Sequence, residues 1–345
     1  MIHPLAEQGR PTSRNYYFSD CHCRKKTGKG MIQIFYKSNG QMEMSQSTDV
    51  LSGLTPEMVV WIDLFAPSGE EKRLTENFVG TTIQSRAQAE EIESSSRFSE
   101  TDTAIFANTN FLIPGPEEYS METVSFILTD NVLVTLRECP LRSLTDLQRK
   151  IQAFPKLYPT GYTVFVSILE QRIDLDADMI ELMSKEIEQF NRKVSLGEDI
   201  NGEFLLDINQ LQENTMLVRE NIVDKQRLIS SLLKSSKYPH SLQPKLNVLL
   251  KDISSLINHT NFGFERLEYL QNTVVGLINL DQNKIMKVFT LVSLLFMPPT
   301  LITGFYGMNL KLPLTDTGWD VVIVLVLMIF SFSIILLIFK KRKML

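Results

Sequence analysis

Two long apolar runs near the C-terminal end dominate the hydropathy pattern of the chain. Residues 288–305 and 321–339 contain no charged side chain, and the runs are 18 and 19 residues long. A helix needs roughly 17–25 predominantly apolar residues to cross a bilayer. The pattern therefore predicts a C-terminal hairpin of two transmembrane helices, at about 285–305 and 320–340, joined by a loop at 307–319.

The helical pattern of the first run extends far upstream of the membrane. No strong helix breaker separates Pro244 from Pro298, so one helix is predicted over 241–306. The 61 residues from Pro244 to Gly304 would span roughly 90 Å at about 1.5 Å per residue. That length is about three times the roughly 30 Å hydrocarbon core of a bilayer. Most of this helix must therefore stand outside the membrane as a stalk.

The N-terminal half has the pattern of a mixed domain of strands and helices. Runs rich in β-branched and aromatic residues predict strands, and Ser68-Gly69-Glu70-Glu71 has the composition of a helix start. Strands interleaved with helices predict a compact α/β domain over 31–160, preceded by a mobile tail at 1–30. The predicted strands are 31–36, 59–64, 103–112, 123–129 and 132–137.

Residues 161–240 show the three- and four-residue apolar spacing of helices. Leu196-Gly197 marks a helix end, so two helices are expected here. Eleven acidic residues against four basic ones lie between Glu170 and Asp207. Such a surface is either a solvated helix face or one that concentrates cations, and the sequence leaves both interpretations open. The predicted fold class is α+β: an N-terminal α/β cytoplasmic domain, a long helical stalk and a C-terminal two-helix transmembrane hairpin.

Basic residues gather at the ends of the apolar runs that face away from the connecting loop. Lys284 and Lys287 precede the first run and four basic residues follow the second, whereas the loop holds a single lysine. The positive-inside rule therefore places both termini in the cytoplasm and the loop outside. We expect a multi-pass protein of the bacterial inner membrane, whose tail at 341–345 would contribute to a basic ring in an oligomer. The residues of this ring are Lys340, Lys341, Arg342 and Lys343.

The sequence contains no catalytic or nucleic-acid-binding pattern. It has no glycine-rich phosphate loop, no Gly-x-Ser-x-Gly and no His-Glu-x-x-His. A net charge of −5 disfavours a nucleic-acid partner. Cys21-His22-Cys23 is spaced too tightly for the usual zinc site, and the isolated Cys139 gives no basis for a disulfide framework. We therefore expect neither an enzyme nor a catalytic cofactor.

One face of the long helix carries small and polar residues, whereas a lipid-facing helix would carry apolar ones. Steps of three and four residues keep its members on one side of the helix, and asparagines continue this face upstream. Small-residue packing between membrane helices is the alternative, and the asparagines favour a water-filled lumen. Because two helices per chain cannot enclose a lumen, a homo-oligomer is required. The predicted lining residues are Gly304, Thr300, Met297, Ser293, Phe289, Met286 and Asn283.

The residues that follow this helix resemble the signature of a known family. Tyr306-Gly307-Met308-Asn309, directly after a proline-containing membrane helix, resembles the motif of CorA-type magnesium channels. Met297-Pro298-Pro299-Thr300 is similar to the proteobacterial branch of that family. The resemblance implies a homopentamer that passes Mg²⁺, with Co²⁺ or Ni²⁺ as minor substrates. It also implies an α/β/α cytoplasmic domain, an antiparallel acidic helix pair at 161–240, and a selectivity filter at Gly307, Met308 and Asn309.

The predicted filter suits a cation that keeps its water. Mg²⁺ dehydrates reluctantly and usually retains several waters when it is bound. Neutral oxygens of Asn309 and Gly307 would hydrogen-bond those waters without holding the ion too tightly, and conduction needs weak, multiple sites. Thr300 and Asn283 would be further stations along the path. The apolar rings of the lining face would gate by dewetting.

Two regions depart from the family pattern. The outer loop lacks the Met-Pro-Glu-Leu of many relatives, and Asp316 is the candidate substitute for its glutamate. In relatives, acids on the soluble domain and on a neighbouring stalk bind regulatory Mg²⁺. Glu91 falls at the first of these positions, but Val248 occupies the stalk position, so the nearby Asp252 is the second candidate ligand. We therefore expect closure by cytosolic Mg²⁺ to use other acids or to be weaker in this protein.

Two alternative functions stay open at this point. The first is a zinc transporter of the related branch, whose members typically carry Gly-Ile-Asn, so that Met308 argues against it. The second is a membrane-anchored scaffold or sensor that uses the hairpin only as an anchor and does not need Asn309. We favour passive uptake of Mg²⁺ down its electrochemical gradient, because no nucleotide-binding motif offers an energy source.

Overall fold

The computed structural model describes residues 30–84, 97–115, 119–197, 200–308 and 319–341. The chain divides into two compact units, residues 1–270 and residues 271–345. Both units contain part of one unbroken helix, α7. Its bounds are Gln243–Tyr306, so the uninterrupted helical pattern of the sequence corresponds to a single helix.

A mixed seven-stranded sheet, with the order β2-β1-β3-β7-β6-β5-β4, forms the centre of the first unit. Strands β3 and β7 pair in parallel and all other neighbours are antiparallel. All five predicted strands are confirmed, and the structure adds the short edge strands β2 and β4. The bounds are β1 Met31–Ser38, β2 Gln41–Ser45, β3 Val59–Phe65, β4 Phe98–Glu100, β5 Ala104–Ile113, β6 Ser120–Thr129 and β7 Val132–Arg137.

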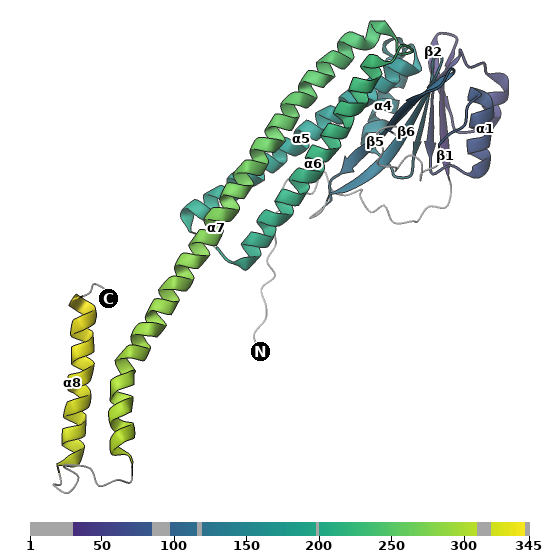
Figure 1. Ribbon diagram of the computed structural model, residues 1–345. Coiled ribbons are helices and arrows are strands. Elements are labelled where there is room, and N and C mark those ends of the chain that lie inside the picture. The colour runs from purple at the N-terminus through teal and green to yellow at the C-terminus, as the bar shows by residue number, and fades with distance from the viewer. Residues whose placement is uncertain (1–29, 85–96, 116–118, 198–199, 309–318, 342–345) are drawn as a thin grey trace. The chain divides into compact units, whose positions relative to one another are not determined.

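Helices cover both faces of this sheet (Figure 1). On one face, helix α1 (Gly69–Val79) packs Phe78 against a buried cluster that includes Ile34 and Ile62. On the other face, the ring centroids of Phe126 on β6 and Phe165 on α5 lie 5.0 Å apart. Helix α4, Arg142–Ala153, covers this second face as well. The α/β/α layering that the resemblance implied is confirmed.

The start of α1 shows why the local sequence forms a helix here. The Ser68 hydroxyl accepts a hydrogen bond from the Glu71 backbone N–H at 3.2 Å. In return the Glu71 carboxylate accepts one from the Ser68 N–H at 2.7 Å. This reciprocal capping box satisfies two N–H groups that a helix end leaves free. Gly80, with φ of 70°, ends the helix in the left-handed conformation that glycine adopts without strain.

The long helices α5 and α6 run antiparallel beside each other (Figure 1). Their bounds are Gly161–Leu196 and Gly202–Lys234. The rings of Phe190 and Phe204 meet near the connection, with centroids 5.2 Å apart. The Arg219 side chain of α6 donates a hydrogen bond to the Asn261 amide oxygen of α7 at 2.7 Å. The described residues of this unit also contain three short 3₁₀ turns: η2 Thr48–Gly53, η3 Pro155–Leu157 and η4 His240–Leu242.

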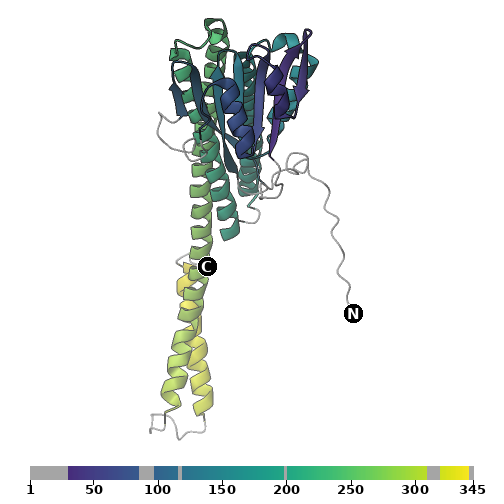
Figure 2. The same ribbon diagram turned by 90° about the vertical axis from the view of Figure 1, so that its right-hand side faces the viewer.

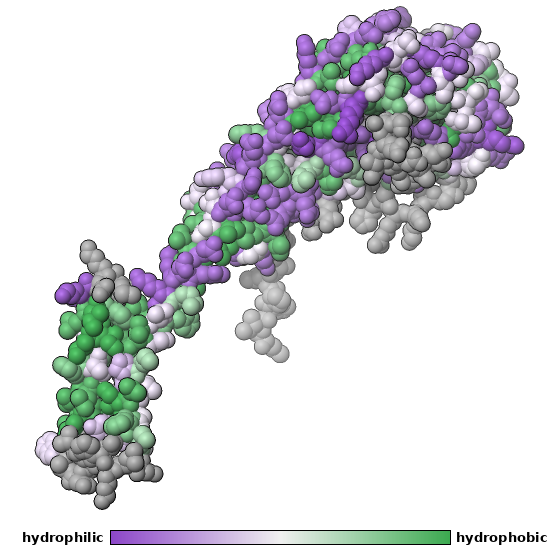
Figure 3. All heavy atoms as spheres, in the orientation of Figure 1, coloured by the Kyte–Doolittle hydropathy of each residue, from purple (hydrophilic) through white to green (hydrophobic). Residues whose placement is uncertain are grey.

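The second unit contains the C-terminal part of α7 and helix α8, Asp320–Lys341. Within the described ranges, two helices are long and apolar enough to cross a membrane, namely α7 and α8. Their apolar windows are not buried by the rest of the chain, and Figure 3 shows hydrophobic residues on their outer surface. A helix that is apolar and unburied must find its apolar surroundings in lipid or in another copy. Both helices thus have the length and composition of membrane-spanning helices.

Candidate functional site

The C-terminal part of α7 has two faces that differ in exposure. Six less exposed residues lie on one side of this part of the helix. Helix α8 lies beside this part of α7 in both views (Figures 1 and 2). All seven predicted lining residues are exposed. At about 100° per residue, the two sets lie on opposite sides of the helix. The less exposed residues are Leu291, Leu295, Pro298, Pro299, Ile302 and Tyr306.

Two adjacent prolines lie inside the helix within this stretch. Helix α7 continues through Pro298 and Pro299 up to Tyr306. Because proline has no N–H, these two residues cannot donate to the carbonyls of Leu294 and Leu295 one turn earlier. Free carbonyls in an apolar environment need other partners. This turn of α7 is therefore the weakest part of its backbone ladder.

Thr300 presents an oxygen on the predicted lining face. Its hydroxyl donates a hydrogen bond to the Phe296 carbonyl at 2.8 Å. A hydroxyl has a single proton, so the Thr300 oxygen keeps only its lone pairs for any further partner. It can therefore accept a hydrogen bond but not donate one. Water molecules bound to a metal cation are hydrogen-bond donors, and this oxygen is suited to receive them.

The helix ends directly before the predicted filter. The Gly307 N–H donates to the Thr303 carbonyl at 2.9 Å, and the Met308 N–H donates to the Phe305 carbonyl at 3.4 Å. No basic residue lies in the last turn of α7. The C-terminus of a helix carries a partial negative charge of about −0.5, so this end attracts cations. Met308 is about half exposed, whereas Asn309 and Asp316 lie outside the described residues.

The basic residues at the end of α8 are described in part. Lys340 and Lys341 are exposed at the C-terminal turn, where positive charges complement the helix dipole. Arg342 and Lys343 lie outside the described residues. The structure therefore places two of the four predicted basic residues at one helix end, and the ring itself stays a prediction.

The proposed regulatory ligands do not form a described site. Asp252 is exposed on α7, and Glu91 lies outside the described residues. The pKa of Asp174 on α5 is raised, first by partial burial and then by the charges of Asp178 and Asp252. Acidic side chains of α5 and α7 thus lie near each other. In the described part of the chain, however, no three His, Cys, Asp or Glu side chains are close enough to hold a metal ion.

A buried charge cluster that was not predicted from the sequence lies between the sheet and the helix pair. Asp176 lies between Lys225, at 2.9 Å, and Arg172, at 3.3 Å. The exposed fraction of each of these side chains is at most 5%. Asn221 completes the cluster, because its amide donates to Asp176 at 3.2 Å and accepts from Lys225 at 2.7 Å. Asp176 was counted with the acidic surface, and its burial corrects that assignment.

The cluster also holds the end of strand β5. Arg172 donates to the Leu112 carbonyl and Lys225 to the Asn110 carbonyl. Both cations lie over the ring of Phe111, at 5.1 and 5.9 Å from its centroid. Burial lowers the pKa of Lys225 to about 8, although the neighbouring Asp176 opposes that shift. The sequence signal was available, because Lys225 continues the apolar series of Val218 and Ile222 on α6 at three- and four-residue steps.

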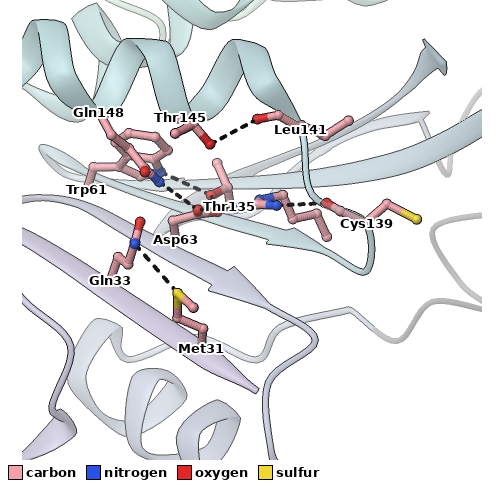
Figure 4. A network of polar contacts seen from close by, with 10 residues as sticks. Met31, Gln33, Trp61, Asp63, Thr135, Cys139, Leu141, Thr145 and Gln148 are labelled. Atoms are coloured by element: carbon pink, nitrogen blue, oxygen red, sulfur yellow. Dashed lines mark hydrogen bonds and ion pairs between the residues drawn. The ribbon is translucent and has the colours of Figure 1, made fainter. Parts of the chain in front are cut away.

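A second buried network lies between the sheet and α4 (Figure 4). The Asp63 carboxylate accepts from the Thr135 hydroxyl at 2.7 Å, from Gln148 at 3.0 Å and from Arg137 at 2.9 Å. Arg137 also donates to the Cys139 carbonyl at 2.7 Å. The Asp63 carboxylate and the Arg137 guanidinium are thus paired within the domain, which indicates a structural role.

Known proteins are similar to this chain in both sequence and fold. The family model described as "CorA-like Mg²⁺ transporter protein" matches residues 56–341. The magnesium transport protein CorA of Wolinella succinogenes is 34% identical over 319 residues, which cover 91% of this chain and 99% of that protein. The magnesium transport protein CorA of Escherichia coli (strain K12) is 29% identical over 287 residues, covering 81% and 89%.

The fold is similar to that of a complete transporter. The CorA magnesium transporter of Methanocaldococcus jannaschii aligns with a TM-score of 0.73 at 19% identity, covering 91% of this chain and 98% of that one. The family match runs from the sheet through α7 to the end of α8, so it includes both the soluble unit and the hairpin. The chain therefore belongs to the family of CorA-like Mg²⁺ transporter proteins.

Proposed function

We propose that this magnesium transporter of the CorA type moves its ion through a water-filled path. Identical chains surround this path, and the exposed face of α7 lines it. Gly307, Met308 and Asn309 form the outer filter, which holds Mg²⁺ through its bound waters. The ion moves down its electrochemical gradient, and the protein performs no catalytic chemistry.

The exposure pattern of α7 is the observation that supports this arrangement best. The predicted lining residues lie on the side opposite the less exposed face, so the hairpin itself does not cover them. Seven positions from Asn283 to Gly304 share this free face, and four of them are small or polar. Such a face is unsuited to lipid, and a closed ring of copies provides it with water instead. The resemblance to the family favours five copies.

The oxygens near the end of α7 suit a hydrated divalent cation. Thr300 offers an acceptor whose own proton is committed to the Phe296 carbonyl. The helix end adds free carbonyls and the negative end of the dipole. Because Mg²⁺ releases its waters reluctantly, neutral acceptors that bind those waters are better suited to rapid passage than a carboxylate ring. Asn309 extends this series in the proposal, and Asp316 gathers cations at the outer mouth.

The remaining lining residues divide the path into wet and dry sections. Met297, Phe289 and Met286 are large, apolar and between 63% and 69% exposed in the single chain. Rings of such side chains close a pore by expelling its water. Asn283 provides a polar ring at the inner end of this section. We place both termini on the cytoplasmic side of the inner membrane, where the charges of Lys340 and Lys341 favour retention.

Ion flux into liposomes that contain the purified full-length protein tests this function. We expect Mg²⁺ to enter without any nucleotide, Co²⁺ to enter as well, and Zn²⁺ to enter much more slowly. A zinc transporter would reverse the order of Mg²⁺ and Zn²⁺. Liposomes that pass none of the three ions would contradict the proposal and would favour a membrane-anchored scaffold. Protein-free liposomes provide the control for leakage.

A further inference from the structure

Thr303 occupies an unusual position in the last turns of α7. Its hydroxyl lies 3.1 Å from the Pro299 carbonyl and 3.0 Å from the Thr300 carbonyl. Its own carbonyl accepts the hydrogen bond from the Gly307 N–H at 2.9 Å. One residue thus connects the proline turn, where the backbone ladder is interrupted, to the first residue of the proposed filter.

The backbone just before Thr303 lacks two hydrogen bonds of a regular helix, because two prolines lie there. Pro298 and Pro299 contribute no N–H to the ladder, and bilayer hydrocarbon offers no water in its place. The carbonyls of Leu294 and Leu295, one turn before the prolines, therefore lack their usual backbone donors. The Thr303 hydroxyl bonds the carbonyls of Pro299 and Thr300, in the turn directly after this interruption, and so adds a side-chain restraint between the interruption and the filter. Threonine hydroxyls that bond back to the preceding turn are known to alter helix bending.

The contact between Thr303 and Gly307 is also tight. A Cβ atom placed on Gly307 would lie 3.0 Å from the Thr303 carbonyl oxygen, closer than nearly all such contacts. The peptide of Thr303 thus lies directly against the α-carbon of Gly307. Any shift of the Thr303 backbone therefore moves its carbonyl. Through the hydrogen bond from Gly307, that shift also moves the start of the proposed filter.

We propose that Thr303 is a positioning residue for the selectivity filter, which it holds in register through its hydroxyl and its carbonyl. The proposal rests on the proposed function of Gly307 and Asn309 as a filter. Thr303 lies about 80° around the helix from the midpoint between Thr300 and Gly304, at about 100° per residue. It therefore acts on the ion through the backbone and not by contact with the ion.

Thr290 on the same helix provides a matched control. Its hydroxyl donates to the Met286 carbonyl at 2.8 Å, which is the same type of back-bond. It lies upstream of the prolines and 13 residues before Thr303. If back-bonding only stabilises the helix in general, the two threonines will respond alike to loss of the hydroxyl.

The test compares Mg²⁺ and Co²⁺ flux in liposomes that contain equal amounts of each full-length variant. Thr303→Val removes the hydroxyl and keeps the shape, and we expect it to lower the Mg²⁺ to Co²⁺ flux ratio roughly three- to tenfold, the factor that one hydrogen bond is worth. Mg²⁺ is affected more because it depends more strongly on its intact water shell. Thr303→Ser is expected to restore the ratio, and Thr290→Val to leave it unchanged. Thr303→Ala serves as a second hydroxyl-free variant if the valine variant is not recovered.

The outcomes separate this inference from the proposed function. A wild-type flux ratio in the hydroxyl-free variants, or an equal change in Thr290→Val, overturns the role of Thr303 alone. A wild-type protein that passes no Mg²⁺ overturns both. A uniform fall of both ion fluxes with an unchanged ratio would show a structural role and would also overturn the positioning proposal.

Discussion

Replacing Asn309 with alanine is expected to reduce Mg²⁺ flux through the transporter by at least about a hundredfold. A hydrogen bond to a charged partner is worth about 1.5–3 kcal/mol, which corresponds to a factor of about 10 to 150. In a symmetric ring every copy loses the same amide at once. The measurement is Mg²⁺ uptake into liposomes at matched protein content.

The control for this variant is a second asparagine on the same chain. Asn247 is exposed near the start of α7, far along the helix from the filter, and Asn247→Ala is expected to transport at the wild-type rate. Undiminished Mg²⁺ uptake by Asn309→Ala would contradict a filter at this residue. It would instead favour an anchor role for the hairpin.

Replacing Asp176 with asparagine is expected to destabilise the soluble unit by about 3–5 kcal/mol, the usual cost of breaking a buried ion pair. The change leaves the buried cations of Arg172 and Lys225 without their shared carboxylate. Thermal unfolding of the full-length protein in detergent, followed by circular dichroism, measures the effect. Asp178→Asn, an exposed acid two residues along the same helix, should change stability by no more than about 0.5 kcal/mol.

The lowered pKa of Lys225 determines how the stability of the protein changes with pH. The pKa of Lys225 in the folded protein is about 8, below its usual value of about 10.4. Between these values the unfolded chain binds more protons than the folded one, so Lys225 makes stability rise with pH in this window. Loss of Asp176 lowers the pKa of Lys225 further and extends the window downward. Equal unfolding temperatures of Asp176→Asn and the wild type near pH 7 would contradict the role assigned to the cluster.

Local sequence signals predicted most of the helices and strands. The helix start expected at Ser68-Gly69-Glu70-Glu71 is present, and Ser68 and Glu71 form a capping box there, which depends only on neighbours three residues apart. The continuous helix α7 followed from the lack of breakers before Pro298. The short edge strands β2 and β4 were missed because edge strands carry mixed polar residues and depend on their partners for pairing.

The burial of Arg172 and Asp176 could not be predicted from the sequence. Arg172 and Asp176 are four residues apart, and the same spacing occurs in exposed helix pairs. Only the packing of α5 and α6 against β5 decides that they are buried, and those partners lie far away in the sequence. The proposed lining face of α7 rests on periodicity within a single helix, which the sequence shows directly. Whether neighbouring copies complete the proposed path depends on contacts between chains, which the pattern along one chain does not show.

The most direct test of a filter that recognises a hydrated ion uses an ion that cannot lose its shell. Cobalt(III) hexaammine carries six non-exchanging ligands that present N–H donors, much as hydrated Mg²⁺ presents the O–H donors of its waters. Added outside liposomes that contain the wild-type protein, it is expected to compete with Mg²⁺ and block its uptake at concentrations comparable to that of Mg²⁺. Unimpeded Mg²⁺ uptake in a large excess of the complex would show that the filter binds the bare ion, and would contradict recognition through the water shell.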